Sequence, residues 1–436
     1  MFTTKLITLD NGLPVLTVAM PSVKSVTALV LTNTGSRYEQ PKEAGIAHFF
    51  EHMVFKGTEK YQTPQELASV IDAIGADSNA FTSKEYTGYY VKSASQHLST
   101  SIEVLSDMLL KPLLRQEDID REKGVIIEEI NMYKDTPMYH VANLFEQMVY
   151  QDFSLSHDII GTKKTVSSLK TADFARFLKE WYGLPNMLVV LAGDAQVLQD
   201  PATLELIQRA FSKKTDGIRI KEKISPKKYF SASPLSSNYL HVENKKTEQA
   251  HLVMGWPGIS RQDEKNKPIL SVLNVIMGGN MSSRLFSEVR EKRGLCYYVH
   301  SEVDSYHEVG LAGASAGVDP ARVHEAVEVI LDEFATLSSG KKPVTKEELS
   351  RAKEYVRGTL TLSFEDSRSV AQHFGLKQLL LNKVESIEET IERMQNVSLE
   401  QVNHLASQLF ESAQPRLVVI GPFKDTEKFA SLIKSH

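Results

Sequence analysis

Gly45-Ile-Ala-His-Phe-Phe-Glu-His-Met-Val-Phe-Lys-Gly-Thr58 is the stretch from which the rest of the sequence is best interpreted. In a helix each residue turns by about 100°, so His48, Glu51 and His52 would share one face. The other positions are apolar nearly all the way round, which is typical of a buried helix. Two neutral imidazoles one turn apart can bind one Zn²⁺ at about 2.0–2.1 Å, and Glu51 can then handle a proton of water. This HxxEH order inverts the common HExxH motif and occurs among metallopeptidases.

A purely structural interpretation of these residues is also open. Two core histidines bonded to backbone carbonyls, with Glu51 neutralising one of them, would show the same pattern, and short motifs recur by chance. A second helix, expected from residue 115 to 133, carries Glu122 and Glu129 seven residues apart and therefore on one face. These carboxylates could complete a metal site, whereas a merely solvated helix face would have the same spacing.

Length, composition and charge narrow the class of protein. A chain of 436 residues is expected to form at least two domains, and 42% hydrophobic with 24% charged residues is ordinary for a globular protein. A net charge of −5 gives no reason to expect nucleic acid or an anionic membrane as partner. Neither a signal peptide nor a membrane-spanning apolar run is evident, so we expect a cytoplasmic protein. The single cysteine, Cys296, excludes an internal disulfide and is expected to fill core space.

The first part of the chain alternates between strand and helix patterns. Asp10-Asn11-Gly12 is a strong hairpin signal, and Thr63 before Pro64 is typical of a helix N-terminus. Pro137 separates the Glu122 helix from a further helical stretch that reaches about residue 150. The expected strands are 3–9, 13–20, 25–34, 77–82, 86–93 and 187–192, and the expected helices include 64–74, 95–110 and 165–180.

The second part of the chain repeats the first. In the register of this repeat, Glu122 lies opposite Ala352 and Glu129 opposite Thr359, while the His48 helix lies opposite 271–275, which contains neither His nor Glu. The paired segments are Tyr89–Met108 with Leu311–Phe334, Leu114–Ile130 with Val344–Leu360, and Phe174–Gly193 with Val402–Gly421. We therefore predict a first half, 1–213, with the metal site, a Lys-, Ser- and Pro-rich linker, 214–232, and a degenerate half without metal ligands, 233–436.

With these residues the whole chain resembles the M16 zinc metallopeptidases, which include pitrilysin, insulin-degrading enzyme and the mitochondrial processing peptidase, and in particular their short, dimer-forming branch. The marker is HxxEH followed after about 76 residues by a third ligand, and here 76 residues lie between His52 and Glu129. The resemblance implies an α+β fold of two homologous α/β-sandwich-like halves, each a mixed or antiparallel sheet covered by helices (the LuxS/MPP-like metallohydrolase fold).

The resemblance also implies roles for individual residues. His48, His52 and Glu129 would bind one Zn²⁺ per chain, Glu51 would act as the base, and Glu122 would orient a ligand or hold the charge of the site. Spacing alone does not exclude the neighbouring Glu128 as third ligand. Glu129 is preferred because Glu122 then lies seven residues earlier, where the family places its second glutamate.

Two further segments match the family. Asn79, Ala80, Phe81 and Thr82 resemble an edge strand that binds peptide by strand addition, although a turn-flanked strand is the simpler interpretation. Arg290 precedes Tyr297 by seven residues, the spacing of an Arg and a Tyr that contact substrate and stabilise the developing oxyanion. The structural alternative pairs Arg290 with Glu288 or Glu291 and leaves Tyr297 half-buried.

The resemblance implies a zinc-dependent endopeptidase or oligopeptidase that cleaves extended or unfolded peptides in a closed chamber. Family members of this length pair two chains, so we expect a homodimer, or a heterodimer with an inactive homologue, in which Arg290 and Tyr297 act on the partner's zinc site. The alternatives are a processing peptidase for presequences, a non-catalytic subunit, and a binding protein with a structural zinc.

Overall fold

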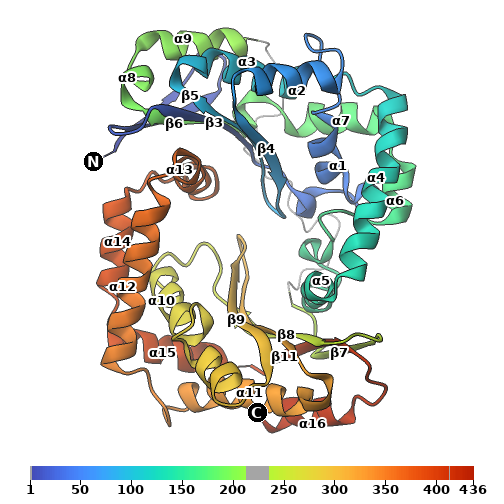
Figure 1. Ribbon diagram of the computed structural model, residues 1–436, viewed down its shortest axis with the longest axis vertical. Helices are drawn as coiled ribbons and strands as arrows, with labels where there is room; N and C mark the ends of the chain where they lie inside the picture. Colours follow the sequence, from blue (N-terminus) through green and yellow to red (C-terminus); the bar gives the residue numbers. More distant parts are fainter. Residues whose placement is uncertain (1, 213–234, 412) are drawn as a thin grey trace. The chain divides into compact units, whose positions relative to one another are not determined.

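The computed structural model describes residues 2–212, 235–411 and 413–436, and these residues form two compact units (Figure 1). Unit 1 contains 2–131, 157–212 and 362–386, and unit 2 contains 132–156, 235–361, 387–411 and 413–436. Each unit has one mixed β-sheet covered by helices, so the predicted fold class is confirmed. The predicted linker, 214–232, lies outside the described residues.

The sheet of unit 1 has the strand order β1-β2-β6-β3-β5-β4, which puts β1 and β4 at its edges. The predicted hairpin is present, with Leu6 opposite Leu16, while β2 and β6 run parallel and the other neighbours antiparallel. All residues of β6 are buried because it lies in the middle of the sheet. The strands are β1 (Thr3–Thr8), β2 (Pro14–Met20), β3 (Ser25–Thr32), β4 (Asp77–Thr82), β5 (Thr87–Ala94) and β6 (Met187–Asp194).

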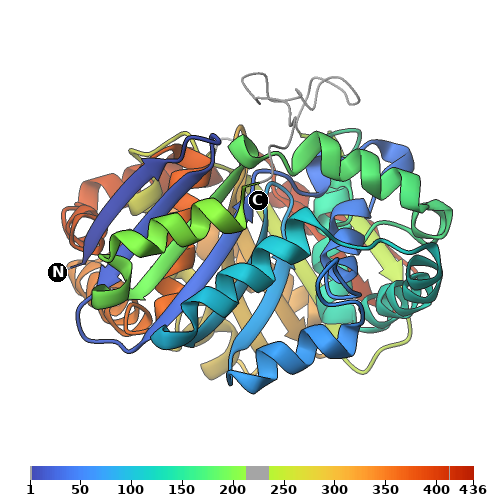
Figure 2. The same ribbon diagram turned by 90° about the horizontal axis from the view of Figure 1, so that it is seen from above.

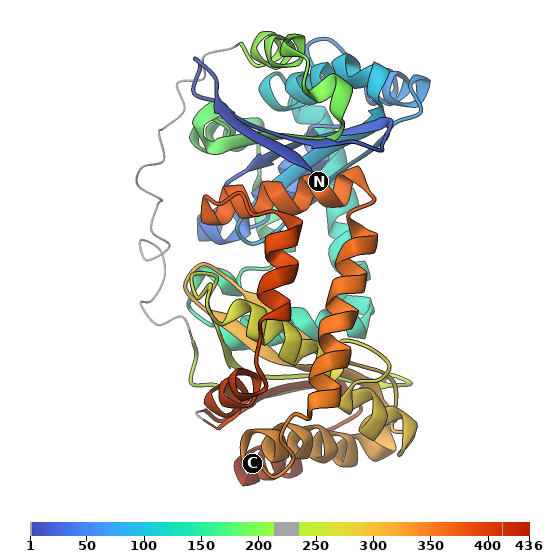
Figure 3. The same ribbon diagram turned by 90° about the vertical axis from the view of Figure 1, so that its left-hand side faces the viewer.

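Helices cover both faces of this sheet. Seen from above, α3 and α9 lie across one face (Figure 2), and α13 lies against the opposite face (Figure 3). Thr63 accepts a hydrogen bond from the Glu66 N–H and so begins α2 as predicted. The helices are α1 (Ile46–Met53), α2 (Pro64–Ala73), α3 (Leu98–Leu110), α4 (Gln116–Asp135), α6 (Lys163–Ser168), α7 (Thr171–Trp181), α8 (Ala195–Leu198), α9 (Pro201–Ala210) and α13 (Ser367–Leu381).

The sheet of unit 2 has the strand order β7-β11-β8-β10-β9, with β7 and β11 parallel and the other neighbours antiparallel. Its strands are β7 (Leu240–Asn244), β8 (Ala250–Gly258), β9 (Cys296–Ser305), β10 (Gly310–Val318) and β11 (Arg416–Gly421). Its helices are α5 (Pro137–Val149), α10 (Lys267–Gly278), α11 (Val323–Ser338), α12 (Lys346–Ser363), α14 (Ile387–Gln395), α15 (Leu399–Phe410) and α16 (Glu427–Ser435), with a π-helix at Phe286–Glu291. Among the described helices, none is long and apolar enough to cross a membrane.

The compact units differ from the two halves of the sequence at two helices. Helix α5, from the first half, packs on β8 and β11 of unit 2, and α13, from the second half, packs on β3 and β6 of unit 1. Glycines allow both contacts, because a Cβ on Gly255 would lie 3.1 Å from the Phe145 ring and one on Gly375 would lie 2.8 Å from Leu31. The apolar pattern of each helix indicates that one of its faces packs on a sheet, but it does not indicate which of the two sheets.

Candidate metal centre

Helix α1 carries the quoted motif and is fixed by its apolar side. The Phe49 ring packs edge-on against Phe174 with centroids 5.0 Å apart, and the Phe50 ring packs against Tyr182 at 4.7 Å. Both phenylalanines are fully buried, whereas the three polar residues of the motif are only partly buried. The buried helix predicted from the sequence is therefore present, and its polar side chains share the remaining face.

The beginning of α1 is held by two residues that the sequence did not single out. Gly45 has φ = +97°, and a Cβ there would lie 2.6 Å from the Ile160 carbonyl oxygen. The Glu39 carboxylate, only 3% exposed, accepts hydrogen bonds from the N–H groups of Gly45 at 2.7 Å and Ala47 at 2.8 Å. Burial raises the pKa of Glu39 to about 8, although the two N–H donors lower it. Glu39 precedes the helix by several residues, so no helical periodicity pointed to it.

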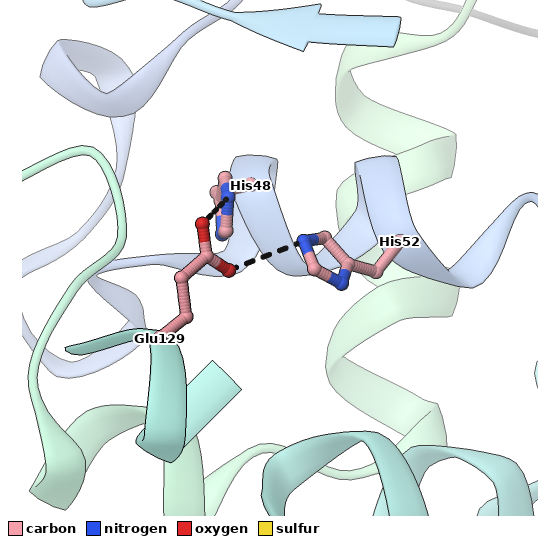
Figure 4. Close-up of side chains that lie close together, drawn as sticks. All are labelled: His48, His52 and Glu129. Carbon is pink, nitrogen blue, oxygen red and sulfur yellow. Dashed lines mark ion pairs between the residues drawn. The ribbon is translucent and has the colours of Figure 1, made fainter. Parts of the chain in front are cut away.

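His48 and His52 face Glu129 of α4 (Figure 4). Nε2 of His48 lies 3.7 Å from Glu129 Oε1, and Nε2 of His52 lies 3.6 Å from Glu129 Oε2. One donor atom from each of the three residues lies within 4.8 Å of the others. Glu128 is exposed and does not belong to this group, so the geometry favours Glu129 over Glu128 as the third donor.

The donor set fits a zinc ion. Donors that share one Zn²⁺ at about 2 Å lie roughly 3–3.5 Å apart, so small side-chain movements would be enough to bind it. Burial, with a smaller contribution from the nearby His52, lowers the pKa of His48 to about 3, so His48 is neutral. Neutral imidazole is the form that binds metal. Three protein donors also leave a position for water, which is typical of catalytic rather than structural zinc sites.

Glu122, the second glutamate named from the resemblance, contacts His52. Oε1 of Glu122 lies 2.9 Å from His52 Nδ1, and Oε2 accepts a hydrogen bond from Lys56 Nζ at 2.6 Å. Burial raises the pKa of Glu122, but the bonds from His52 and Lys56 outweigh burial and keep the pKa below its ordinary value. An ionised Glu122 can accept a hydrogen bond from the Nδ1–H group of His52. The proton then stays on Nδ1, and the Nε2 lone pair is left free for a metal. Lys56 belongs to the quoted stretch, yet its charge alone gave no signal of this contact.

Glu51 lies on the same face of α1 and contacts β4. The Thr82 hydroxyl donates to Glu51 Oε2 at 2.5 Å. Burial raises the pKa of Glu51, whereas the Thr82 bond and the nearby His52 lower it. A carboxylate with a pKa raised toward neutrality suits a group that accepts a proton and later releases it.

The four predicted substrate-binding residues lie in β4, the edge strand next to β5. The Ala80 N–H donates to the side-chain oxygen of Asn79 at 2.8 Å. The Phe81 ring lies over Gly88, where a Cβ would come within 2.3 Å of it. Asn79, Ala80 and Phe81 therefore form a strand edge, while the side chain of Thr82 is directed to Glu51.

Arg290 and Tyr297 belong to unit 2 and contact each other. The Arg290 guanidinium donates to the Tyr297 carbonyl oxygen at 2.7 Å and lies 5.5 Å from the Tyr297 ring centroid. Tyr297 is 73% exposed rather than half-buried. Glu288, the alternative partner of Arg290, is bonded by Lys292 and Arg293. Cys296 packs against the core of unit 2, and burial raises the pKa of its thiol to about 11, so it is a neutral filler.

Two imidazoles, a carboxylate and a neighbouring base in an α/β unit define a candidate metallohydrolase centre. Residues 14–163 match the family described as Insulinase (Peptidase family M16), and residues 168–356 match the Peptidase M16 inactive domain. The chain belongs to peptidase family M16. This agrees with the resemblance inferred from the motif and its spacing.

Curated relatives agree with this membership, and solved structures share the fold. An uncharacterized zinc protease of Streptomyces coelicolor is 35% identical over 96% of this chain and 90% of its own length. An uncharacterized zinc protease of Bacillus subtilis is 36% identical over 92% of this chain and 95% of its own length. A protease from Helicobacter pylori has the same fold, with a TM-score of 0.85 and 22% identity over 97% of this chain and 100% of its own. A peptidase M16 inactive domain from Pseudomonas fluorescens gives a TM-score of 0.86 at 19% identity over 97% of this chain and 98% of its own.

Proposed function

We propose that this protein is a zinc-dependent endopeptidase or oligopeptidase that cleaves extended or unfolded peptides in a closed chamber. His48, His52 and Glu129 would hold one Zn²⁺ per chain. The observation that carries the proposal is the meeting of these three donors, from two helices, within 4.8 Å. When bound, zinc would polarise the scissile carbonyl and lower the pKa of water, so that water can lose a proton and attack the carbonyl at neutral pH.

The residues around the metal site supply the remaining chemistry. Glu51 accepts a proton from the attacking water on its carboxylate and passes it to the leaving amine. Glu122 keeps the Nδ1 proton on His52, and Lys56 holds the second oxygen of Glu122. The raised pKa of Glu51 supports the first role, because a carboxylate with a higher pKa accepts a proton from water more readily.

The substrate would bind as an added strand beside β4. The backbone N–H of Ala80 donates to the Asn79 side chain of its own strand, and an incoming peptide carbonyl could replace that oxygen. Main-chain hydrogen bonds of this kind select extended backbone rather than a particular sequence. Most backbone of a folded protein is already paired in helices and sheets, whereas unfolded peptides offer free extended backbone, which supports unfolded peptides as the substrate class.

Arg290 and Tyr297 would stabilise the oxyanion in the active site of a partner chain, in a homodimer or a heterodimer with an inactive homologue. Their mutual contact and the 73% exposure of Tyr297 support this role, because they present a fixed cation and a free phenol. A lone chain would then be nearly inactive. A stable monomer that cleaves peptides at full rate would contradict this part of the proposal.

The complete donor set and base argue against a non-catalytic subunit or a structural zinc protein. A processing peptidase for presequences would use the same chemistry and is distinguished by substrate profiling. The experiment that tests the proposal compares wild type with Glu51→Gln, using Glu128→Gln as a matched control on an exposed glutamate. We expect one zinc per chain in all three and loss of peptide hydrolysis in Glu51→Gln alone. Normal hydrolysis by Glu51→Gln would remove Glu51 as the base.

A further inference from the structure

The Thr82 hydroxyl joins the edge strand to the motif helix. Thr82 is the last residue of β4, and its Oγ1 lies 2.5 Å from Oε2 of Glu51 in α1. Both side chains are partly buried, so water competes only weakly for this bond. The sequence suggested Thr82 as one of four residues that contact substrate. The direction of its side chain gives it a different task.

The bond makes the two oxygens of Glu51 unequal. The Thr82 hydroxyl is the donor, and its single proton points at Oε2. Oε2 loses basicity through this bond, while Oε1 keeps its lone pairs. Rotation of the carboxylate about its terminal torsion is otherwise soft, and the bond restricts it.

We propose that Thr82 is a positioning residue for Glu51: its hydroxyl holds one carboxylate oxygen, so that the other oxygen faces the attacking water and carries the proton. This inference rests on the proposed function of Glu51 as the base. The strand that binds the peptide through Ala80 is thereby the strand that orients the base through Thr82, two residues along. A peptide paired with β4 fixes the backbone of Thr82 and, through the hydroxyl, the carboxylate.

A positioning role differs in its kinetics from a substrate contact or a fold contact. A residue that only contacts the peptide in both ground and transition states changes KM and leaves kcat unaltered. A residue that only stabilises the fold changes the melting temperature. Loss of a residue that orients the base lowers kcat, because a misplaced base slows the chemical step and not the binding of substrate.

The test compares Thr82→Val, which keeps the shape and loses the hydroxyl, with Thr82→Ser, which keeps the hydroxyl. Thr17→Val is the matched control, because Thr17 lies in β2 of the same sheet and its hydroxyl is 3.5 Å from the Lys5 carbonyl. We expect Thr82→Val to lower kcat by about 10- to 100-fold, the effect of a hydrogen bond to a charged group, with KM within about twofold. Zinc content and melting temperature should match wild type, and Thr82→Ser should recover most of kcat.

Three results would overturn the inference: unchanged kcat in Thr82→Val, a change confined to KM, or an equal loss in Thr82→Ser and Thr82→Val. Glu51→Gln, assayed in parallel, separates this inference from the function on which it rests. If Glu51→Gln is inactive while Thr82→Val is normal, only the role of Thr82 fails. If Glu51→Gln hydrolyses peptide normally, the proposed base fails first.

Discussion

Units 1 and 2 have corresponding helix pairs that carry different residue types at corresponding positions. In unit 1 a short helix, α1, faces a long helix, α4, through His52 and Glu122, whose side chains lie 2.9 Å apart. In unit 2 the corresponding helices are α10 and α12, and the corresponding residues, Val275 and Ala352, line one small cavity. In the repeat register, His48, Glu51, His52, Glu122 and Glu129 correspond to Ser271, Asn274, Val275, Ala352 and Thr359.

The difference teaches that the fold does not require the polar residues of α1 and α4. In unit 2 the corresponding positions hold the apolar residues Val275 and Ala352, which need no compensating hydrogen bonds. Unit 1 places Glu122 at 5% exposure and must pair it with both His52 and Lys56. Burying charged groups costs free energy even when they are paired, so stability alone does not account for this set. The proposed zinc ion would account for it.

The largest expected effect comes from removing a donor in unit 1 and altering its counterpart in unit 2. Glu129→Gln replaces a negatively charged zinc ligand with a neutral amide, so we expect loss of bound zinc and a fall in peptide hydrolysis on the order of 10³-fold or more. Thr359→Gln, at the corresponding exposed helix position, should change neither. Zinc analysis and an activity assay on both variants check this. Equal losses in the two variants would mean that the comparison between the units is wrong.

A smaller effect is expected for the residue that orients His52. Glu122→Gln retains the shape but offers a weaker acceptor to His52 Nδ1 and leaves Lys56 without its carboxylate. We expect zinc affinity or activity to fall about 10- to 100-fold, the usual effect of removing a carboxylate behind a metal-binding histidine. Zinc titration in a competing chelator measures the affinity. Unchanged affinity and activity would show that the Glu122–His52 contact, which Ala352 and Val275 lack, is only structural.

A still smaller effect is expected at the strand edge. Ala80→Pro removes the N–H that now donates to Asn79, and proline is tolerated on edge strands. We expect KM for an extended peptide to rise about 10-fold, which corresponds to one main-chain hydrogen bond of about 1.4 kcal/mol, while zinc content stays at one per chain. Steady-state kinetics decide the matter. If KM stays the same, peptides do not bind beside β4 through Ala80.

Glu39 makes a prediction about stability rather than activity. Burial raises its pKa from 4.5 to about 8, so its contribution to stability is full below about pH 4.5 and is lost as the pH rises through 8. The groups that act on it are the N–H donors of Gly45 and Ala47, Lys84 and Glu43. We expect wild type to lose more stability than Glu39→Gln between pH 5 and 8. Melting temperatures of both proteins across this range measure the difference, and parallel curves would contradict it.

Local structure, and the meeting of His48, His52 and Glu129, could be predicted from the sequence for physical reasons. The apolar pattern around His48, the Thr63–Pro64 helix start and the Asn11–Gly12 turn are all local signals. The placement of β6 between β2 and β3, and of α13 on the sheet of unit 1, depends on contacts between distant segments that periodicity does not encode.

The missed contacts of the site have the same cause. Glu39, Lys56 and Thr82 act through one or two hydrogen bonds or ion pairs to residues distant in the local pattern. Nothing in the spacing of Glu39 or Lys56 marked them, and Thr82 was named only as part of the edge strand, not as a partner of Glu51. Glu128 and Glu129 could be separated only by the turn of α4, which exposes the first and directs the second toward His48 and His52.

The most direct measurement is a crystal structure of the zinc-loaded protein with anomalous scattering recorded at the zinc edge. We predict one anomalous peak in unit 1 of each chain, about 2 Å from Nε2 of His48, Nε2 of His52 and a carboxylate oxygen of Glu129, with a further position left for water. No peak should occur between α10 and α12 of unit 2. A zinc ion bound elsewhere, or His48 and His52 turned away from Glu129 in the presence of zinc, would contradict the proposed metal centre.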